Sequence, residues 1–532
     1  MPSPLVATLA VAAVLLAGCS TSHRSSAGDA PSPSAATFAP TDPEGPARAF
    51  LAAWAGKRYD DLQPLTDEAQ TAVGDVYRRL ADRLQIERMT VTTKPWDSTS
   101  LSLPYHAVLS LRGLGDLPVD NEVRVVESAA GPKVAFSSAT VWPGLVAGQR
   151  VDRVPVVARG RLLDRHGVPL RGVSPDLDVN VLGTVVNGHG VNGVERVLDA
   201  QLVGGTATAV QVVNATTGET VREIRRWGAA APGRDVRTTL DANVQRAATA
   251  ALATAPGVAA LVAVDSSTGG VLAVANKPPT GFPPALAGSY APGSTFKVAT
   301  ALAALTNGFT PDSPVDCPET VAAGGKVFRN HERGNRGRIP LRQAFAQSCN
   351  TAFINTAQQL PKGSITAAAR LLGFNAGSPL PIHSAGGTLP PPADTAEASA
   401  DAIGQGRVEA SPLTMAAVAA AVANGTWRQP HLAACADCRA QALPPAAVAA
   451  LRSMMRSTVT SGTASALSGL AGAPAAKTGT AEYGAGTPPA THAWMIGYRG
   501  GLAFAVYVET GESGGRTAGP LARRFLASLP CC

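Results

Sequence analysis

The segment at residues 291–308, APGSTFKVATALAALTNG, places a serine and a lysine three positions apart in front of a long apolar run. Pro292 and Gly293 precede Ser294, and Lys297 follows it, so the sequence predicts a turn that leads into a buried helix. Side chains three positions apart on a helix lie on the same face and can reach each other. Either Ser294 is a nucleophile with Lys297 as its base, or both residues open an ordinary buried helix.

A serine hydroxyl becomes a useful nucleophile only when a neighbouring group takes its proton. A lysine can do this only if its pKa falls far enough for the amine to be neutral for part of the time. Burial lowers a lysine pKa, and so does nearby positive charge, including the partial charge at the start of a helix. Because the residues after Lys297 are apolar, we expect this lysine to be buried and its pKa to be lowered.

A second motif lies further along the chain, in AQSCNTAF at residues 346–353. Ser348 and Asn350 form an S-x-N pair there, with Cys349 between them. A second hydroxyl and an amide can relay a proton and orient a substrate. The ordinary alternatives are a helix-capping serine and a turn asparagine.

A third motif, Lys477-Thr478-Gly479-Thr480, lies in a strand-like stretch, AAKTGTAE. The cation and the hydroxyls can hold a carboxylate, and Gly479 would let a substrate backbone approach. By chance, a chain of this composition contains roughly half an S-x-x-K match and roughly a tenth of a K-T-G match. One motif alone is therefore weak evidence, whereas all three in this order favour a serine acyltransferase.

The segments around these motifs predict an α+β fold. Residues 260–276 and 491–509 each read as two apolar strands around a glycine-containing turn, and the K-T-G stretch supplies a fifth strand. An alanine-rich segment that is predicted to be mostly helical separates the two groups of strands. Residues 518–529 are predicted to form a helix after the last strand. Strands from both ends with helices between them predict one five-stranded antiparallel sheet covered by helices.

With 532 residues, of which 45% are hydrophobic and 16% charged, the chain is long enough for several domains. Asp164 and Arg165, in the segment before the main domain, are interpreted as an ordinary ion pair. The predicted divisions are a signal peptide at 1–18, a lipidated cysteine and flexible linker at 19–41, an α+β domain at 42–146, a small β-rich domain at 147–235 and the main domain at 236–530.

The first 20 residues, MPSPLVATLAVAAVLLAGCS, contain a short apolar stretch that ends in small residues. This pattern is typical of a secretory signal, and an uncleaved anchor is the alternative. The segment that ends at Cys19 resembles a bacterial lipoprotein box, in which the cysteine is lipidated and becomes the mature N-terminus. We therefore expect the bulk of the protein on the extracytoplasmic side of the cell membrane, held by a lipid anchor.

The net charge of +7 is spread along the chain without a basic run or interleaved aromatic residues, so nucleic acid is not an expected partner. Six cysteines remain after Cys19. In an oxidising compartment they can form disulfides. Cys435 and Cys438 form a lone C-x-x-C that predicts a local disulfide or free thiols rather than a metal site, and Cys349 is either free or paired with Cys317.

The ordered set of three motifs resembles the penicillin-binding proteins and serine β-lactamases. Three further segments point to the monofunctional class B lipoproteins of the penicillin-binding family. Residues 49–145 look like an NTF2-like domain, RGRLLDRHGVPL at 159–170 is similar to a stretch of the class B pedestal, and IGQG at 403–406 resembles another family segment. His492 lies on the strand after the K-T-G motif, where the family assigns it no catalytic role, so we interpret it as a packed histidine.

The resemblance implies a role for each motif residue. Ser294 would attack the carbonyl carbon of the penultimate D-Ala of a peptidoglycan stem peptide, with Lys297 as the base. Ser348 and Asn350 would relay the proton and orient the substrate.

The K-T-G strand would hold the substrate. Lys477, Thr478 and Thr480 would bind its terminal carboxylate, and backbone N–H groups of Ser294 and Thr480 would form the oxyanion hole. No metal and no organic cofactor is expected. The resemblance also implies covalent inhibition by β-lactam antibiotics, and candidate partners among cell-wall synthesis or division proteins.

Two alternatives share the same motifs: a β-lactam hydrolase or sensor, and a catalytically silent scaffold. A β-lactam hydrolase would not need the long N-terminal region, and a sensor would need membrane-spanning and cytoplasmic parts. A catalytically silent scaffold would not need all three motifs intact. We therefore expect a peptidoglycan D,D-transpeptidase with a penicillin-binding/β-lactamase-like catalytic domain.

Overall fold

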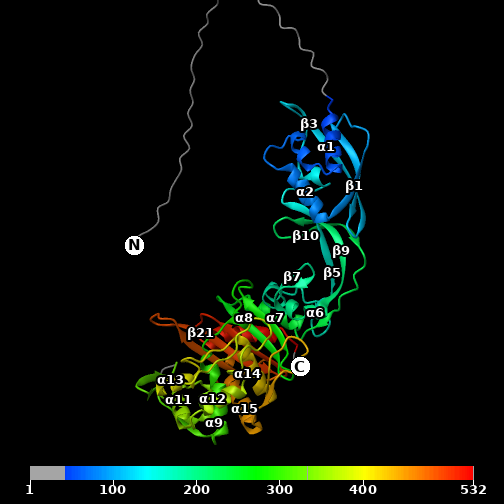
Figure 1. Cartoon of the computed structure of the whole chain (residues 1–532). Helices are drawn as coiled ribbons and strands as arrows, with labels where there is room; N and C mark the ends of the chain where they lie inside the picture. The colour runs from blue at the N-terminus through cyan, green and yellow to red at the C-terminus, as the bar shows by residue number, and fades with distance from the viewer. Residues whose placement is uncertain (1–41, 332–333, 531–532) are drawn as a thin grey trace, which may run out of the picture. The chain divides into compact units, whose positions relative to one another are not determined.

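The computed structural model describes residues 42–331 and 334–530. The chain forms two compact units, of which the first ends at Ala147 and the second begins at Gly148 (Figure 1). The predicted signal peptide and the linker up to residue 41 lie outside the described residues, and the further division near residue 235 stays a prediction.

Unit 1 is an α+β unit in which helices pack on a four-stranded antiparallel sheet of order β1-β2-β3-β4. The first helix buries an apolar stripe that includes Phe50, Leu51 and Trp54. Trp54 packs against Tyr77 and Tyr105 at ring-centroid distances of 5.5 and 5.7 Å. The elements are α1 (Gly45–Ala55), η1 (Tyr59–Asp61), η2 (Gln63–Leu65), α2 (Val73–Leu84), β1 (Ile86–Thr93), β2 (Ser102–Leu111), β3 (Gly115–Ser128), β4 (Gly131–Val134) and α3 (Ser138–Val141).

Unit 2 begins with a β-rich part built on a three-stranded sheet of order β10-β9-β5. Arg159, at the end of β5, forms ion pairs with the carboxylates of Glu195 and Asp199 and so ties this strand to two short helices. The elements are β5 (Gln149–Arg159), β6 (Leu162–Leu163), α4 (Pro175–Leu177), η3 (Asp178–Leu182), β7 (Val185–Val186), β8 (His189–Gly190), α5 (Gly193–Val197), α6 (Asp199–Leu202), β9 (Val203–Asn214), β10 (Thr220–Trp227) and β11 (Val236–Arg237).

The predicted ion pair between Asp164 and Arg165 is wrong. Asp164 is buried, and its carboxylate accepts hydrogen bonds from the backbone N–H groups of His166, Val168 and Ala242 at 2.8, 2.8 and 3.2 Å. Arg165 pairs with Asp265 at 3.3 Å instead. A buried carboxylate needs several donors, and a tight turn and a helix start provide them here.

The main sheet of unit 2 has five antiparallel strands in the order β13-β12-β22-β21-β20, so the predicted five-stranded sheet is confirmed. The pairing of β12 with β22 brings strands from the two ends of the domain together, and the K-T-G strand β20 forms one edge. The strands are β12 (Ala259–Asp265), β13 (Val271–Lys277), β20 (Ala475–Tyr483), β21 (Ala490–Arg499) and β22 (Leu502–Val508).

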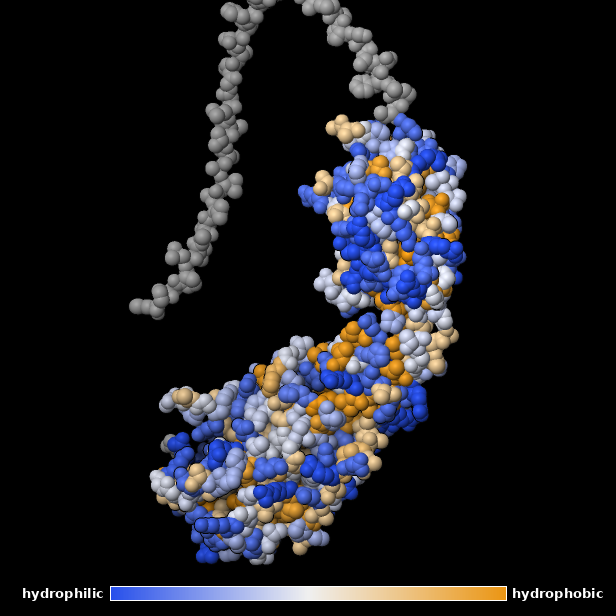
Figure 2. Space-filling view, viewed as in Figure 1, coloured by the Kyte–Doolittle hydropathy of each residue, from blue (hydrophilic) through white to orange (hydrophobic). Residues whose placement is uncertain are grey.

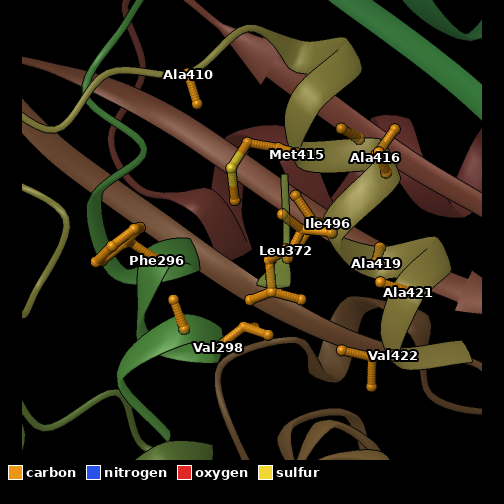
Figure 3. Packing of buried hydrophobic residues seen from close by; sticks show 14 of the residues in the cluster. Phe296, Val298, Leu372, Ala410, Met415, Ala416, Ala419, Ala421, Val422 and Ile496 are labelled. Carbon is orange, nitrogen blue, oxygen red and sulfur yellow. The ribbon is translucent and has the colours of Figure 1, made fainter. Parts of the chain in front are cut away.

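Helices cover both faces of this sheet (Figure 1). On one face, Leu252 and Phe525 pack with apolar strand residues, and on the other face α14 is buried along nearly its whole length. Figure 3 shows Met415 of this helix close to Ile496 of β21. The helices are α7 (Ala242–Leu252), α8 (Pro284–Ala287), η4 (Gly293–Phe296), α9 (Lys297–Thr306), α10 (Leu341–Ala346), α11 (Asn350–Gln359), α12 (Ser364–Leu371), α13 (Thr395–Asp401), α14 (Pro412–Asn424), α15 (Pro445–Ser461), η5 (Ser465–Leu467), η6 (Gly514–Ala518) and α16 (Gly519–Ala527).

The long segment between the two strand groups is predicted to be mostly helical, and it also contains three short antiparallel strand pairs. These strands are three or four residues long, too short to give a clear alternating pattern in the sequence. They are β14 (Pro314–Cys317) with β17 (Gly337–Pro340), β15 (Thr320–Ala323) with β16 (Lys326–Arg329), and β18 (Thr426–Arg428) with β19 (Ala440–Ala442).

No helix within residues 42–331 and 334–530 is long and apolar enough to cross a membrane. In the surface view of Figure 2, hydrophobic residues gather around β7. Val179, Val186 and Val191 in this part of unit 2 are exposed by 57%, 47% and 46%. These exposed valines are separate from the motif residues.

Candidate active site

Ser294 lies in the single 3₁₀ turn η4, and Lys297 is the first residue of the following helix α9. The neighbours Phe296 and Val298 point into the apolar core beside the sheet (Figure 3). This packing draws the turn into the protein, where Ser294 is 8% exposed and Lys297 is 0% exposed. The predicted burial of Lys297 is therefore confirmed.

Close backbone contacts fix the turn that carries Ser294. Gly293 has φ +52°, and its N–H donates to the carbonyl of Gly404 at 2.8 Å. A Cβ on Gly404 would lie 2.0 Å from the carbonyl oxygen of Gly293. Only glycine allows this approach. The IGQG segment therefore packs directly against the backbone of the serine turn and fixes its position.

Gly479 contacts the same turn from the edge strand β20. A Cβ at this position would lie 2.7 Å from the carbonyl oxygen of Pro292 and 2.8 Å from Cγ2 of Thr295. From the sequence we expected a substrate backbone to lie against Gly479. In the structure, the protein's own serine turn occupies that space. A direct role of Gly479 toward substrate stays a prediction.

The S-x-N motif lies between α10 and α11. Ser348 has φ +58°, a conformation that costs energy for a residue with a Cβ and recurs at functional sites. Asn350 is the first residue of α11, and its Nδ2 donates to the carbonyl of Arg329 at 3.1 Å. Between them, Cys349 forms a disulfide with Cys317, as one of the two alternatives predicted.

Lys297 joins the first two motifs. Its Nζ lies 3.0 Å from Oγ of Ser294, 2.8 Å from the carbonyl oxygen of Ser348 and 2.6 Å from Oδ1 of Asn350. Both oxygens from the S-x-N motif can only accept, so they take two N–H groups of the amine. When Lys297 is neutral, its lone pair is left for the hydroxyl proton of Ser294.

Lys477 joins the third motif to the second. Its Nζ donates to Oγ of Ser348 and to the carbonyl oxygen of Thr478, both at 2.9 Å. Lys477 is 0% exposed, and no carboxylate pairs with either motif lysine among the residues that the structure describes. Two buried lysine amines therefore face the hydroxyl of Ser348.

Burial lowers the pKa of both lysines, and the charge of Lys477 adds to the effect at Lys297. Burial is the larger cause at Lys297, the charge of Lys477 is the smaller one, and together they hold the pKa of Lys297 well below the ordinary lysine value. Burial lowers the pKa of Lys477 to about 7. The charge of Lys477 therefore favours a neutral amine at Lys297, which is the state a base requires.

The two threonines of the third motif have partners that the sequence did not reveal. Oγ1 of Thr478 lies 2.5 Å from Oγ1 of Thr463, and Oγ1 of Thr480 accepts from the backbone N–H of Gly514 at 3.3 Å. A threonine in an SGTA loop and a glycine in a GESGG run carry no motif signal of their own. Only the folded chain brings them to β20.

His492 is packed, as predicted. It is 6% exposed, Nδ1 lies 2.7 Å from the carbonyl oxygen of Glu509, and the ring stacks on Tyr483 at a centroid distance of 3.9 Å. Burial lowers its pKa. The structure gives His492 no hydrogen bond to Ser294 or to Lys297.

The remaining cysteine motif has a structural role. Cys435 and Cys438 form a disulfide, one of the two outcomes predicted for this C-x-x-C. Within the described ranges, no group of three or more His, Cys, Asp or Glu side chains is arranged to hold a metal ion.

Two family models match the chain. The penicillin binding protein transpeptidase domain matches residues 259–527, and the NTF2-like N-terminal transpeptidase domain matches residues 42–149. Among curated proteins, the peptidoglycan D,D-transpeptidase PbpA of Mycobacterium tuberculosis is 30% identical over 357 residues, which cover 55% of this chain and 72% of that protein.

Solved structures are similar too. Penicillin-binding protein A of M. tuberculosis, as a ceftriaxone acyl-enzyme complex, has 25% identity and a TM-score of 0.57 over 70% of this chain and 98% of that one. A chain of a peptidoglycan synthase complex that coordinates polymerization and crosslinking has 26% identity and a TM-score of 0.58 over 72% of this chain and 92% of that one. With its three motifs joined at one buried site and both domain families matched, the chain belongs to the penicillin-binding protein transpeptidase family, as a class B member with an NTF2-like N-terminal domain.

Proposed function

We propose that this protein is a serine D,D-transpeptidase that cross-links peptidoglycan stem peptides through an acyl-enzyme. One observation carries the proposal: the amine of Lys297 is held by two acceptor oxygens and lies 3.0 Å from Oγ of Ser294. The activity named for the relative PbpA supports the substrate class.

In the acylation step, Lys297 takes the hydroxyl proton of Ser294 as Oγ attacks the carbonyl carbon of the penultimate D-Ala. The bond from that carbon to the nitrogen of the terminal D-Ala breaks, and the leaving amine needs a proton. Ser348 is the best placed relay, because its Oγ lies 3.4 Å from Nζ of Lys297 and accepts from Lys477 at 2.9 Å. The serine ester and free D-Ala result.

The K-T-G strand is proposed to bind the terminal carboxylate of the donor peptide through Lys477, Thr478 and Thr480. Backbone N–H groups of Ser294 and Thr480 would stabilise the oxyanion as it develops, an effect that is usually the largest in acyl transfer. In the second step, the amine of a neighbouring stem attacks the ester carbonyl and gives up a proton. Oγ of Ser294 leaves and takes a proton back through Lys297.

Acylation by labelled benzylpenicillin followed by peptide mapping tests this proposal. The label should appear on the peptide that contains Ser294, should persist for many minutes, and should be absent from the Ser294→Ala variant. Among the described residues, no carboxylate contacts Ser294 or Lys297, so rapid activation of water is not expected. Turnover of benzylpenicillin many times per minute would favour the hydrolase alternative.

We further propose that Cys19 carries the lipid that anchors the protein on the extracytoplasmic side of the cell membrane. The residues before Cys19 resemble a lipoprotein box and lie outside the described residues. Replacing Cys19 with Ala should release the protein from the membrane fraction or leave the signal uncleaved. Unchanged processing together with unchanged membrane retention would contradict the anchor.

Unit 1 and the β-rich start of unit 2 are proposed to act as a spacer between that anchor and the catalytic site. The synthase complex among the similar structures makes a cell-wall synthesis protein a reasonable class of partner. Co-purification of the full chain from detergent-solubilised membranes tests this: a polymerising enzyme should be recovered with it.

A further inference from the structure

Thr463 lies in the loop that follows α15 and contacts a residue of the K-T-G strand. Its Oγ1 is 2.5 Å from Oγ1 of Thr478, which is 5% exposed. The Thr463 backbone is tightly held: its N–H donates to the carbonyl of Ala346 at 3.1 Å, and a Cβ on Gly515 would lie 2.5 Å from its carbonyl oxygen. These contacts fix the Thr463 backbone, and its hydroxyl lies against Thr478.

Both threonine hydroxyls can donate or accept, and Thr463 has one other acceptor within reach. That acceptor is the carbonyl oxygen of Ala346, at 3.5 Å, and it already accepts the Thr463 N–H. A hydroxyl at 2.5 Å is much the better partner. Either oxygen can be the donor in the free protein. A carboxylate can only accept, so a Thr478 hydroxyl that donates to a bound carboxylate must accept from Thr463.

Thr480, on the same strand, shows the same arrangement. Its Oγ1 accepts from the backbone N–H of Gly514 at 3.3 Å, so its proton is also left for an outside acceptor. A carboxylate can only accept, and a hydroxyl that already accepts from the protein is pre-oriented to donate to it. When a carboxylate is bound, Thr463 therefore donates a hydrogen bond to Thr478 in the way that the N–H of Gly514 donates to Thr480.

We propose that Thr463 is a positioning residue which orients the Thr478 hydroxyl as a donor to the terminal carboxylate of the donor peptide. The inference rests on the proposed function, because it assigns that carboxylate to the K-T-G strand. Thr463 acts only through Thr478, so its effect depends on the negative charge of the substrate.

The test compares second-order acylation rates for benzylpenicillin and for its neutral methyl ester. Thr463→Val keeps the shape of the side chain and removes the donor. It should lower the rate with benzylpenicillin about tenfold, because the bond from Thr478 to the charged carboxylate is weakened, and should change the rate with the methyl ester by less than about twofold. Thr463→Ser keeps the hydroxyl and should stay within about threefold of the parent protein.

A matched control is Thr458→Val in α15. Thr458 is also buried, and its hydroxyl donates only to the carbonyl of Met454 at 3.1 Å. It should leave both rates unchanged, while thermal melts report any loss of folding in either variant. If Thr463→Val does not fold, Thr463→Ala against Thr463→Ser gives the same comparison.

Equal losses with the acid and the ester would show a structural role only and would overturn the inference, as would no loss with benzylpenicillin. If the unmodified protein itself is not acylated at Ser294, the proposed function fails instead. The two failures are therefore distinguishable in one set of measurements.

Discussion

At the scale of single residues, the site depends on which of two buried lysines carries the proton. Lys297 has two N–H groups held by acceptors and faces the hydroxyl of Ser294, whereas Lys477 faces Ser348 and a backbone carbonyl. Burial lowers the pKa of both, and the charge of Lys477 lowers that of Lys297 further. In the proposed mechanism, the active form has a neutral Lys297 beside a charged Lys477.

This charge state predicts a bell-shaped pH profile for the second-order rate of acylation by benzylpenicillin. The rate rises with pH as Lys297 loses its proton, and it falls above about pH 7 as Lys477 loses its charge. Lys477→Arg keeps a positive charge at all these pH values, so it should abolish the alkaline fall and retain the acid limb. An alkaline fall that persists in this variant would contradict the assignment of the limb to Lys477.

The motif residues could be predicted from the sequence because their spacing carries the chemistry. Ser294 and Lys297 are neighbours on one turn, and the other two motifs each lie within a few residues of chain. Thr463 and Gly514 could not be predicted, since their contacts with β20 arise only from the tertiary fold. The misassigned partner of Asp164 has the same cause: its donors come partly from Ala242, in a helix far along the chain.

At the scale of elements, glycines let two segments, at Gly404 and Gly479, pack against the serine turn. Gly404→Ala would place a Cβ 2.0 Å from the carbonyl oxygen of Gly293, and we expect it to lower the acylation rate at least about tenfold and to lower the melting temperature. Gly484→Ala is the matched control, because both glycines have φ +75° and a Cβ on Gly484 would meet nothing within 4 Å. Equal effects of the two changes would mean that backbone strain alone, and not the contact with the turn, is responsible.

The disulfide between Cys317 and Cys349 ties β14 to the residue beside Ser348. Its partners are 32 positions apart, and closing such a loop contributes about 3–4 kcal/mol to the free energy of unfolding through the chain entropy that it removes from the unfolded state. The double serine variant should lose about that much in urea unfolding and should also be acylated more slowly.

The corresponding variant of Cys435 and Cys438 provides the comparison, because those cysteines are only 3 positions apart. It should cost much less stability and leave acylation unchanged. If both double variants lose the same stability, loop closure is not the source of the effect.

The element pattern itself was largely predictable. Apolar runs of strand length around glycine turns identified four of the five strands, and the K-T-G stretch supplied the fifth. Their placement at the two ends of the domain indicated a single sheet. The short strand pairs such as β14 with β17 were missed, because strands of four residues are set by tertiary contacts rather than by periodicity.

At the scale of the whole molecule, every motif residue lies in unit 2, which begins at Gly148. A protein that starts at residue 148 should therefore be acylated by benzylpenicillin within about twofold of the rate for the full chain, since the pKa shifts and hydrogen bonds of the site involve residues of this unit. Stopped-flow acylation of both proteins, with melting curves to confirm folding, makes the comparison. A large loss in the shortened protein would assign unit 1 a part in the chemistry.

The central claim is that Lys297 is the base and Lys477 a charge, and arginine at each position separates the two roles. Arginine keeps a positive charge but does not give up its proton in a protein. Lys297→Arg should lower the second-order acylation rate with benzylpenicillin at least about a thousandfold, whereas Lys477→Arg should keep measurable acylation. Equal losses, or a milder loss at Lys297, in variants shown by thermal melts to be folded, would contradict the assignment of Lys297 as the base.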